Sequence, residues 1–222
     1  MKDLKILMID DHPMIIEGYQ NTILSSANND YNITIDIAHD CDSALYKINK
    51  SQRTDPYNIF FVDIRIPPTS DGSITSGEDL SKHIRKVLPD AKIIILTMHN
   101  ESYRIHNIIK TINPEGLLIK SDLTSSELSE AFYKVLDNPP YYSSTVNGFL
   151  RKTITSDIVL DDKNRKILHL LSKGVKTKNL SDHLGLSLSA VEKRKKQLKM
   201  LFSVEDGEDE TLLREARSKG FL

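Results

Sequence analysis

The first 136 residues alternate short apolar runs with amphipathic stretches, and this alternation constrains the fold more than any other feature of the chain. Runs with the length and composition of strands buried on both faces occur at residues 5–9, 33–38, 58–62, 92–96 and 116–119. Amphipathic stretches with helical periodicity follow them at residues 13–24, 42–49, 78–87, 101–112 and 125–136. Five strand–helix units in succession predict a doubly wound α/β domain, in which right-handed crossovers connect a five-stranded parallel sheet.

The pattern changes after residue 136. Residues 137–156 contain Pro139, Pro140 and Gly148 among several Ser and Thr, which predicts a linker with some local structure. Only helical patterns follow, at residues 161–172, 176–184, 188–202 and 208–219. The sequence therefore predicts a domain at 1–136, a linker at 137–156 and a smaller all-α domain of four helices at 157–222.

Charge also divides the chain. Residues 1–150 carry 14 Lys and Arg against 20 Asp and Glu, whereas residues 151–222 carry 16 against 11. A basic C-terminal part is consistent with a nucleic-acid partner. The single cysteine, Cys41, cannot form an intramolecular disulfide, and no apolar run approaches the roughly 20 residues that span a bilayer. With no signal-peptide pattern at the start, we expect a cytoplasmic protein without a membrane partner.

Polar side chains follow four of the five predicted strands. Asp10 and Asp11 follow the first strand, Asp63 the third, Thr97 the fourth and Lys120 the fifth. The carboxyl ends of parallel strands meet at one edge of a sheet, where ligands bind. Three carboxylates gathered there favour a hard cation, and Mg²⁺ is the expected cofactor. An Asp can accept a phosphoryl group as an acyl phosphate, and a Lys and a Thr can then contact its oxygens.

The runs MIDDHP, FFVDIRIP, LTMH and LLIKS resemble the receiver domain of response regulators, across residues 1–136. The resemblance implies a flavodoxin-like fold and a sensor histidine kinase as the phosphoryl donor. It also implies that the chain is no enzyme beyond its own phosphorylation and dephosphorylation. By position, Asp63 is the phospho-acceptor, and Thr97 and Lys120 contact the phosphoryl group. The implied protein ligands of Mg²⁺ are Asp10 (largely through water), Asp11, Asp63 and the backbone carbonyl of Arg65.

Three departures from the receiver pattern stand out. Receivers place a glycine about eight residues after the acceptor, but Gly77 lies 14 residues after Asp63, so we expect Thr69–Ser76 to contain an inserted polar surface loop. Leu117 stands where receivers usually have an aromatic switch residue. Ser121 replaces a frequent proline or acid after Lys120.

The C-terminal run LSDHLGLSLSAVEKRKKQLKMLF reads as helix, tight turn and second helix, with an apolar stripe and an opposite basic face. Such a helix can lie in the major groove of DNA. The segment resembles the LuxR-type helix-turn-helix domain of NarL/FixJ-like regulators, which implies a double-stranded operator and a homodimer. The candidate DNA contacts are Ser189, Glu192, Lys193, Arg194, Lys196 and Lys199. Glu192 replaces a frequent lysine and, as an acceptor, would favour a cytosine amine.

Three functions are consistent with these patterns. The first is a two-component response regulator that is phosphorylated on Asp63 and controls transcription by sequence-specific DNA binding. The second is a phosphorylation-independent DNA-binding regulator whose receiver serves for dimerisation, which the departure at Leu117 favours slightly. The third is a signalling adaptor whose helical domain binds protein. Salt-dependent DNA binding would distinguish the third from the other two.

Overall fold

The computed structural model describes residues 1–27, 30–205 and 207–222. The chain divides into two compact units, residues 1–100 with 107–146, and residues 101–106 with 147–222. Each unit has its own hydrophobic core. No helix within the described part of the chain is both long and apolar enough to cross a membrane.

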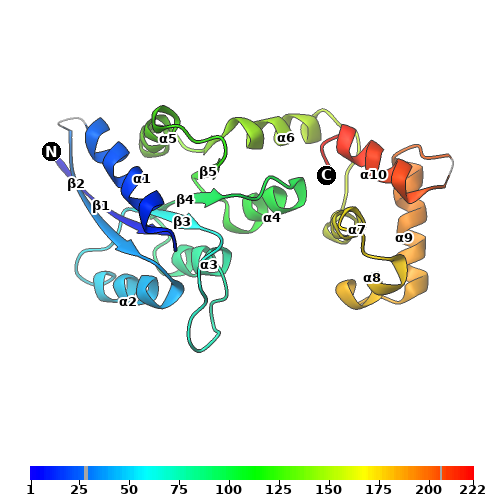
Figure 1. The fold of residues 1–222 in the computed structure, drawn as a ribbon, viewed down its shortest axis with the longest axis horizontal. Helices are drawn as coiled ribbons and strands as arrows, with labels where there is room; N and C mark the ends of the chain where they lie inside the picture. Colours follow the sequence, from blue (N-terminus) through cyan, green and yellow to red (C-terminus); the bar gives the residue numbers. More distant parts are fainter. Residues whose placement is uncertain (28–29, 206) are drawn as a thin grey trace. The chain divides into compact units, whose positions relative to one another are not determined.

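The first unit is built on a six-stranded parallel sheet with the order β2-β1-β3-β4-β5-β6. Its strands are β1 (Lys2–Ile9), β2 (Tyr31–Ala38), β3 (Ile59–Asp63), β4 (Lys92–Thr97), β5 (Gly116–Ile119) and β6 (Tyr141–Tyr142). The helices that follow the first five strands are α1 (Pro13–Ser26), α2 (Cys41–Ser51), α3 (Gly77–Val87), α4 (Ser102–Ile112) and α5 (Ser125–Asp137). Helices α1 and α5 pack together on one face, with α2 and α3 on the other (Figure 1). The predicted doubly wound fold is confirmed.

The central strands are apolar because both of their faces are covered. Every residue of β3 and β5 is buried. On the α1/α5 side, Phe61 of β3 stacks on Phe132 of α5 with their ring centroids 6.5 Å apart. Ile16 and Ile23 of α1 join the same core. This packing positions β3 in the core, and it thereby positions Asp63, the last residue of the strand.

The sixth strand was not predicted, so the prediction of five strands is corrected to six. The amide of Tyr141 donates to the carbonyl of Glu115 over 2.9 Å, and the amide of Ser143 donates to the carbonyl of Leu117 over 3.0 Å. Two residues are too few to show the alternation that predicts a strand, and Pro139 and Pro140 directly precede them. Helix α6 (Ser144–Ile154) then begins inside the segment predicted as a linker.

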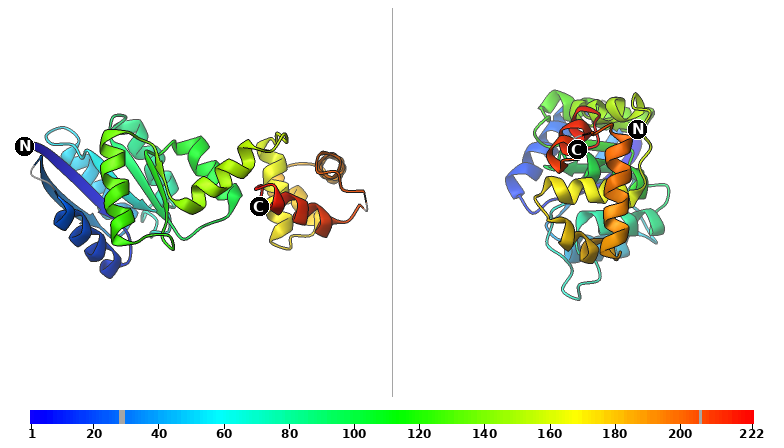
Figure 2. Two further views of the ribbon diagram at one scale, coloured as in Figure 1. Left: turned by 90° about the horizontal axis from the view of Figure 1, so that it is seen from above. Right: turned by 90° about the vertical axis from the view of Figure 1, so that its right-hand side faces the viewer.

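The second unit contains the four predicted helices, α7 (Asp162–Ser172), α8 (Thr177–Leu184), α9 (Leu188–Leu201) and α10 (Asp209–Ser218). Gly185 has a φ of 60° and ends α8, which allows the tight turn before α9. Leu180, Val191 and Leu198 are fully buried where α8 and α9 meet α7. Figure 2 shows α8 (gold) and α9 (orange) crossing as a helix-turn-helix pair.

The inserted segment Thr69–Ser76 forms a loop that leads into α3 (Figure 1). The amide of Thr69 donates to the carbonyl of Ile74 over 2.9 Å, and the Thr69 hydroxyl accepts from the Ile74 amide. Both side chains are buried, so the expected polar surface loop has an apolar base. Ser70 ties the loop to the first turn of α2 through its amide and hydroxyl, which both donate to Asp42.

Gly77 lies against the backbone of the residue that ends β3. A Cβ atom at this position would be 1.9 Å from the Asp63 carbonyl oxygen, far inside van der Waals contact. The Gly77 amide donates to the carbonyl of Ile64 over 3.0 Å. Gly77 lies further from Asp63 in the sequence than the glycine of the usual pattern. It nevertheless allows a close approach of α3 to the end of β3.

We expect Gly77→Ala to lower the free energy of unfolding by about 2 kcal/mol or more, because the added methyl group clashes with immobile backbone. Gly18→Ala in α1 is the matched control. A Cβ at Gly18 meets nothing within 4 Å, so alanine should stabilise that helix by about 0.5–1 kcal/mol. Urea denaturation of both variants measures the difference. Equal effects would contradict the close approach at Gly77.

Candidate functional site

A buried ammonium joins two carboxylates at the carboxyl edge of the sheet. Asp10 directly follows β1, Asp63 ends β3, and Lys120 directly follows β5. The Lys120 Nζ donates to Asp10 Oδ2 over 2.6 Å and to Asp63 Oδ2 over 2.9 Å. None of the three side chains is more than 6% exposed. The three strand ends thus bring together the residues that the sequence places at this edge.

The carboxylate of Asp63 lies in an environment that opposes its charge. Burial raises its pKa and the neighbouring Asp10 adds to this, whereas Lys120 and the backbone amide of Arg65 act in the opposite direction; the net pKa is raised. Burial also opposes the charge on Lys120, but its hydrogen bonds to Asp10 and Asp63 outweigh that effect and raise its pKa. The Lys120 ammonium therefore stays charged and offsets part of the buried negative charge.

Four ligand atoms at this edge could hold a divalent cation. One atom each from Asp10, Asp11, His12 and Asp63 lies within 4.8 Å of the others. Asp11 is exposed, and the imidazole Nδ1 of His12 lies 2.6 Å from Asp11 Oδ1. Carboxylate oxygens in a cluster open to solvent on one side fit Mg²⁺, which keeps several waters in its shell. Sequence reasoning did not include His12, although the run DDH contains it.

Thr97 ends β4 and is buried beside this cluster. Its hydroxyl accepts a hydrogen bond from the amide of His99, and its carbonyl accepts from the amide of Lys120. Arg65 Nε donates to His99 Nε2 over 3.1 Å, so the side chains two residues beyond Asp63 and Thr97 contact each other. The predicted role of the Arg65 carbonyl as a metal ligand stays a prediction.

Leu117 is completely buried in β5. Its backbone carbonyl accepts from the amide of Ser143, at the end of β6. Its side chain lies on a face of the sheet in the core of this unit, and it has no aromatic ring. The leucine that stands in place of the expected aromatic residue is therefore part of the core of this unit.

Ser121, which replaces the frequent proline or acid after Lys120, is followed by Asp122, and the Asp122 carboxylate makes the contacts that fix this turn. The carboxylate of Asp122 accepts from the hydroxyl of Ser143 over 2.8 Å and from the amide and hydroxyl of Thr145 over 3.1 and 2.9 Å. Burial raises the pKa of Asp122, but these donors outweigh it and hold the pKa below its usual value. The turn that carries Lys120 is thus attached to the first turn of α6.

A second candidate site lies on α9 in the helical unit. Ser187 caps this helix through its hydroxyl, which accepts from the Ala190 amide. The predicted contacts fall into two groups. Those with exposed side chains are Ser189, Glu192, Lys193 and Lys196.

The other two predicted contacts, Arg194 and Lys199, are less exposed and bind carboxylates of the same unit. Arg194 Nη1 lies 2.7 Å from Asp161 Oδ2, and Lys199 Nζ lies 2.9 Å from Asp209 Oδ1. Lys195, which sequence reasoning passed over, joins Thr177 of α8 to Asp209 of α10. These cations therefore link α9 to α7, α8 and α10.

The family model for the response regulator receiver domain matches residues 6–131, a range that includes the carboxylates, Thr97 and Lys120. The chain belongs to the response regulator receiver family. The acidic cluster at the sheet edge thus lies within the matched range.

Similarity to response regulators extends beyond the receiver domain. The oxygen regulatory protein NreC of Staphylococcus carnosus is 26% identical over 204 residues, covering 86% of this chain and 88% of NreC. The transcriptional regulatory protein MctR of Rhizobium johnstonii is 25% identical over 198 residues, covering 88% of this chain and 86% of MctR. Because these matches cover more of the chain than the receiver domain, they also include part of the helical unit.

Solved structures of RcsB share the fold. A structure of two RcsB dimers bound to two parallel DNAs has a TM-score of 0.65 at 21% identity and covers 98% of this chain and 99% of that one. RcsB from Salmonella enterica serovar Typhimurium, bound to a promoter with a phosphomimetic beryllium fluoride, has a TM-score of 0.63 at 22% identity, covering 97% of this chain and 98% of that one. At this identity the likeness shows the arrangement of elements within each unit.

We expect Asp63→Asn and Asp122→Asn to change stability in opposite directions. The raised pKa of Asp63 means that its ionised form destabilises the native state, so Asp63→Asn should raise the melting temperature at pH 7. That gain should disappear as the pH falls through the folded pKa towards 3.8, the ordinary value. The lowered pKa of Asp122 means that Asp122→Asn should lower the melting temperature at pH 7, and this loss should disappear only below 3.8.

Thermal melts from pH 7 to pH 3 in EDTA, which removes divalent cations, test both variants. A loss of stability at neutral pH in Asp63→Asn would contradict the electrostatic description of the buried carboxylates.

Proposed function

We propose that this response regulator accepts a phosphoryl group on Asp63 from a sensor histidine kinase and regulates transcription by binding a double-stranded DNA operator as a homodimer. The observation that carries the proposal is the buried Lys120 ammonium between Asp10 and Asp63. An ammonium held in this position lies ready to contact the oxygens of a phosphoryl group on Asp63.

The proposed chemistry is one phosphoryl transfer. A carboxylate oxygen of Asp63 attacks the phosphorus of a phosphohistidine. The new P–O bond forms as the P–N bond breaks, and the electron pair stays on the imidazole of the donor. Thr97, whose hydroxyl now accepts from His99, can turn its own proton towards a phosphoryl oxygen. Mg²⁺, held by Asp10, Asp11 and Asp63, would neutralise charge on the phosphoryl group.

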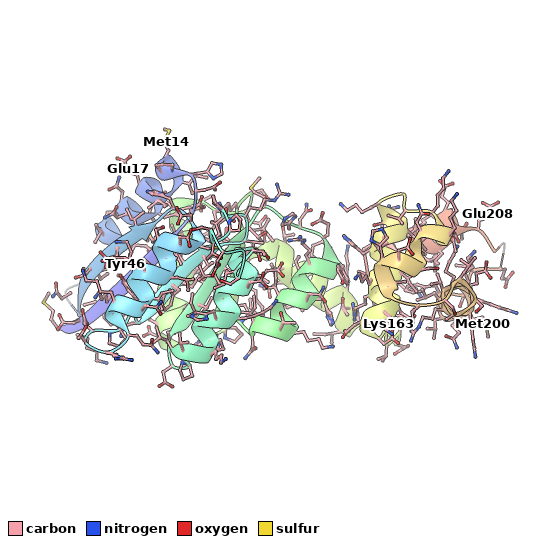
Figure 3. All side chains as sticks on the ribbon, turned by 90° about the horizontal axis from the view of Figure 1, so that it is seen from below. Met14, Glu17, Tyr46, Lys163, Met200 and Glu208 are labelled. Atoms are coloured by element: carbon pink, nitrogen blue, oxygen red, sulfur yellow. The ribbon has the colours of Figure 1, made fainter. Side chains whose placement is uncertain are left out.

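The surface beside the site has room for a donor protein. A hollow next to Lys120 is lined by Met14, Tyr19 and Met98, among others. Met14 and Glu17 point outward from α1 (Figure 3), and Met14 is 86% exposed. Exposed large apolar side chains around a hollow are typical of protein contact surfaces. This supports a protein, and not a small molecule alone, as the phosphoryl donor.

The DNA-binding part of the proposal rests on the helix-turn-helix pair. The exposed face of α9 carries Lys193 and Lys196, which can meet phosphates on either side of a groove. Because Arg194 and Lys199 bind Asp161 and Asp209 within the unit, we narrow the proposed DNA contacts to Ser189, Glu192, Lys193 and Lys196.

Phosphorylation should raise the affinity for an operator. We expect acetyl phosphate with Mg²⁺ to add the mass of one phosphoryl group to the wild type and to tighten its binding to a selected operator. Asp63→Asn should show neither change. Intact-protein mass spectrometry and fluorescence anisotropy with labelled DNA measure the two effects.

The same experiment distinguishes the second candidate function, which the buried Leu117 favours slightly because it lacks the aromatic ring of the usual rotamer switch. Equal operator affinity of the wild type and Asp63→Asn, with and without the phosphodonor, would overturn phosphorylation control. It would favour a DNA-binding protein that uses its receiver for dimerisation.

Salt dependence tests the DNA contacts one at a time. Lys193→Ala and Lys196→Ala should each weaken binding and reduce the slope of log affinity against log salt by about one for each phosphate that is no longer neutralised. Lys86→Ala on α3 of the receiver, which removes the same charge outside the helical unit, should leave the slope unchanged. Unchanged slopes in all three variants would favour a protein partner for the helical unit.

A further inference from the structure

The outer face of α9 carries one carboxylate among its exposed cations. Glu192 is exposed, and it lies one residue before Lys193 and one helical turn before Lys196. The remaining cations of the helix lie closer to the core, and among them Lys195 and Lys199 both bind Asp209. The positive charges that face outward are therefore those of Lys193 and Lys196, and the negative charge of Glu192 offsets one of the two.

Glu192 has no role that the fold requires. Within the described part of the chain it makes no hydrogen bond or ion pair, and it does not cap the helix, a role that belongs to Ser187. A glutamate one turn before a lysine contributes only a few tenths of a kcal/mol to an exposed helix. On a surface that meets DNA, the same carboxylate is repelled by every phosphate. It lowers affinity unless it contacts a hydrogen-bond donor.

The major groove offers two kinds of base donor. These are the N4 amine of cytosine and the N6 amine of adenine. A carboxylate only accepts hydrogen bonds. Adenine presents its N7 acceptor beside the N6 amine, which repels a carboxylate, whereas cytosine presents its amine alone. The chemistry of Glu192 therefore matches cytosine.

We propose that Glu192 is a specificity-determining residue that accepts a hydrogen bond from the N4 amine of a cytosine in the operator. The inference rests on the proposed DNA binding and deepens it. Lys193 and Lys196 give affinity for any sequence through phosphates, and Glu192 lowers that affinity except where the cytosine lies below it. The same side chain thus weakens non-specific binding and strengthens one base preference.

Selection from a randomised DNA duplex library tests this, with full-length wild type, Glu192→Gln and Glu210→Gln, each with Mg²⁺ and acetyl phosphate. Glu210 is exposed on α10, so Glu210→Gln makes the same change in charge away from the outer face of α9. We expect the wild type to prefer cytosine at one position for each bound protomer, on the order of tenfold over other bases. Glu192→Gln should lose cytosine there and gain adenine, because an amide pairs with N6 and N7 together.

Affinity for an unselected duplex gives a second readout. It should rise in Glu192→Gln while affinity for the wild-type site falls. The same base preference in the wild type and Glu192→Gln would overturn the inference, as would an equal change in Glu210→Gln. A wild type that enriches no sequence would overturn DNA binding itself. Matched melting temperatures of the three proteins verify that they are equally folded.

Discussion

The contact of one ammonium with two buried carboxylates organises the receiver unit. Lys120 reaches both Asp10 and Asp63 because β1, β3 and β5 end at the same edge, with β1 beside β3 in the sheet. Buried ion pairs add little to stability, since desolvation offsets the attraction. The ion pairs matter here for the electrostatics of the site. The carboxylate of Asp63 has a raised pKa, and the Lys120 ammonium is already in place to offset additional negative charge. The surrounding structure holds these groups at fixed distances.

Two attachments extend from this contact into the rest of the unit. Gly77 allows α3 to approach the carbonyl of Asp63, so the end of β3 is covered despite the eight residues from Thr69 to Ser76 that precede it. On the other side, Asp122 binds Ser143 and Thr145 and so fixes the start of α6 to the turn that carries Lys120. The cluster of Asp10, Asp63 and Lys120 and the beginning of α6 are therefore only a few hydrogen bonds apart.

The fold and the cluster of Asp10, Asp63 and Lys120 could be predicted from the sequence because they depend on local patterns. Apolar runs predicted five strands, and the polar residues at their ends predicted the cluster of Asp10, Asp63 and Lys120. Strand β6 was missed because two residues carry no periodicity. The position of Asp122 as a cap for α6 depends on a contact across more than 20 residues, which no local pattern shows. Likewise, the sequence could not separate the exposed Lys196 from the paired Lys199, because both lie on a basic helix and only the position of Asp209 distinguishes them.

The most direct test of the account is to locate the phosphoryl group chemically. Borohydride reduces an aspartyl phosphate to homoserine, which marks the acceptor permanently. After incubation with acetyl phosphate and Mg²⁺, followed by reduction and peptide mass analysis, the account predicts homoserine at position 63 and unmodified Asp10 and Asp11. Homoserine at another position, or at none, would contradict the role assigned to the buried contact of Lys120 with Asp10 and Asp63.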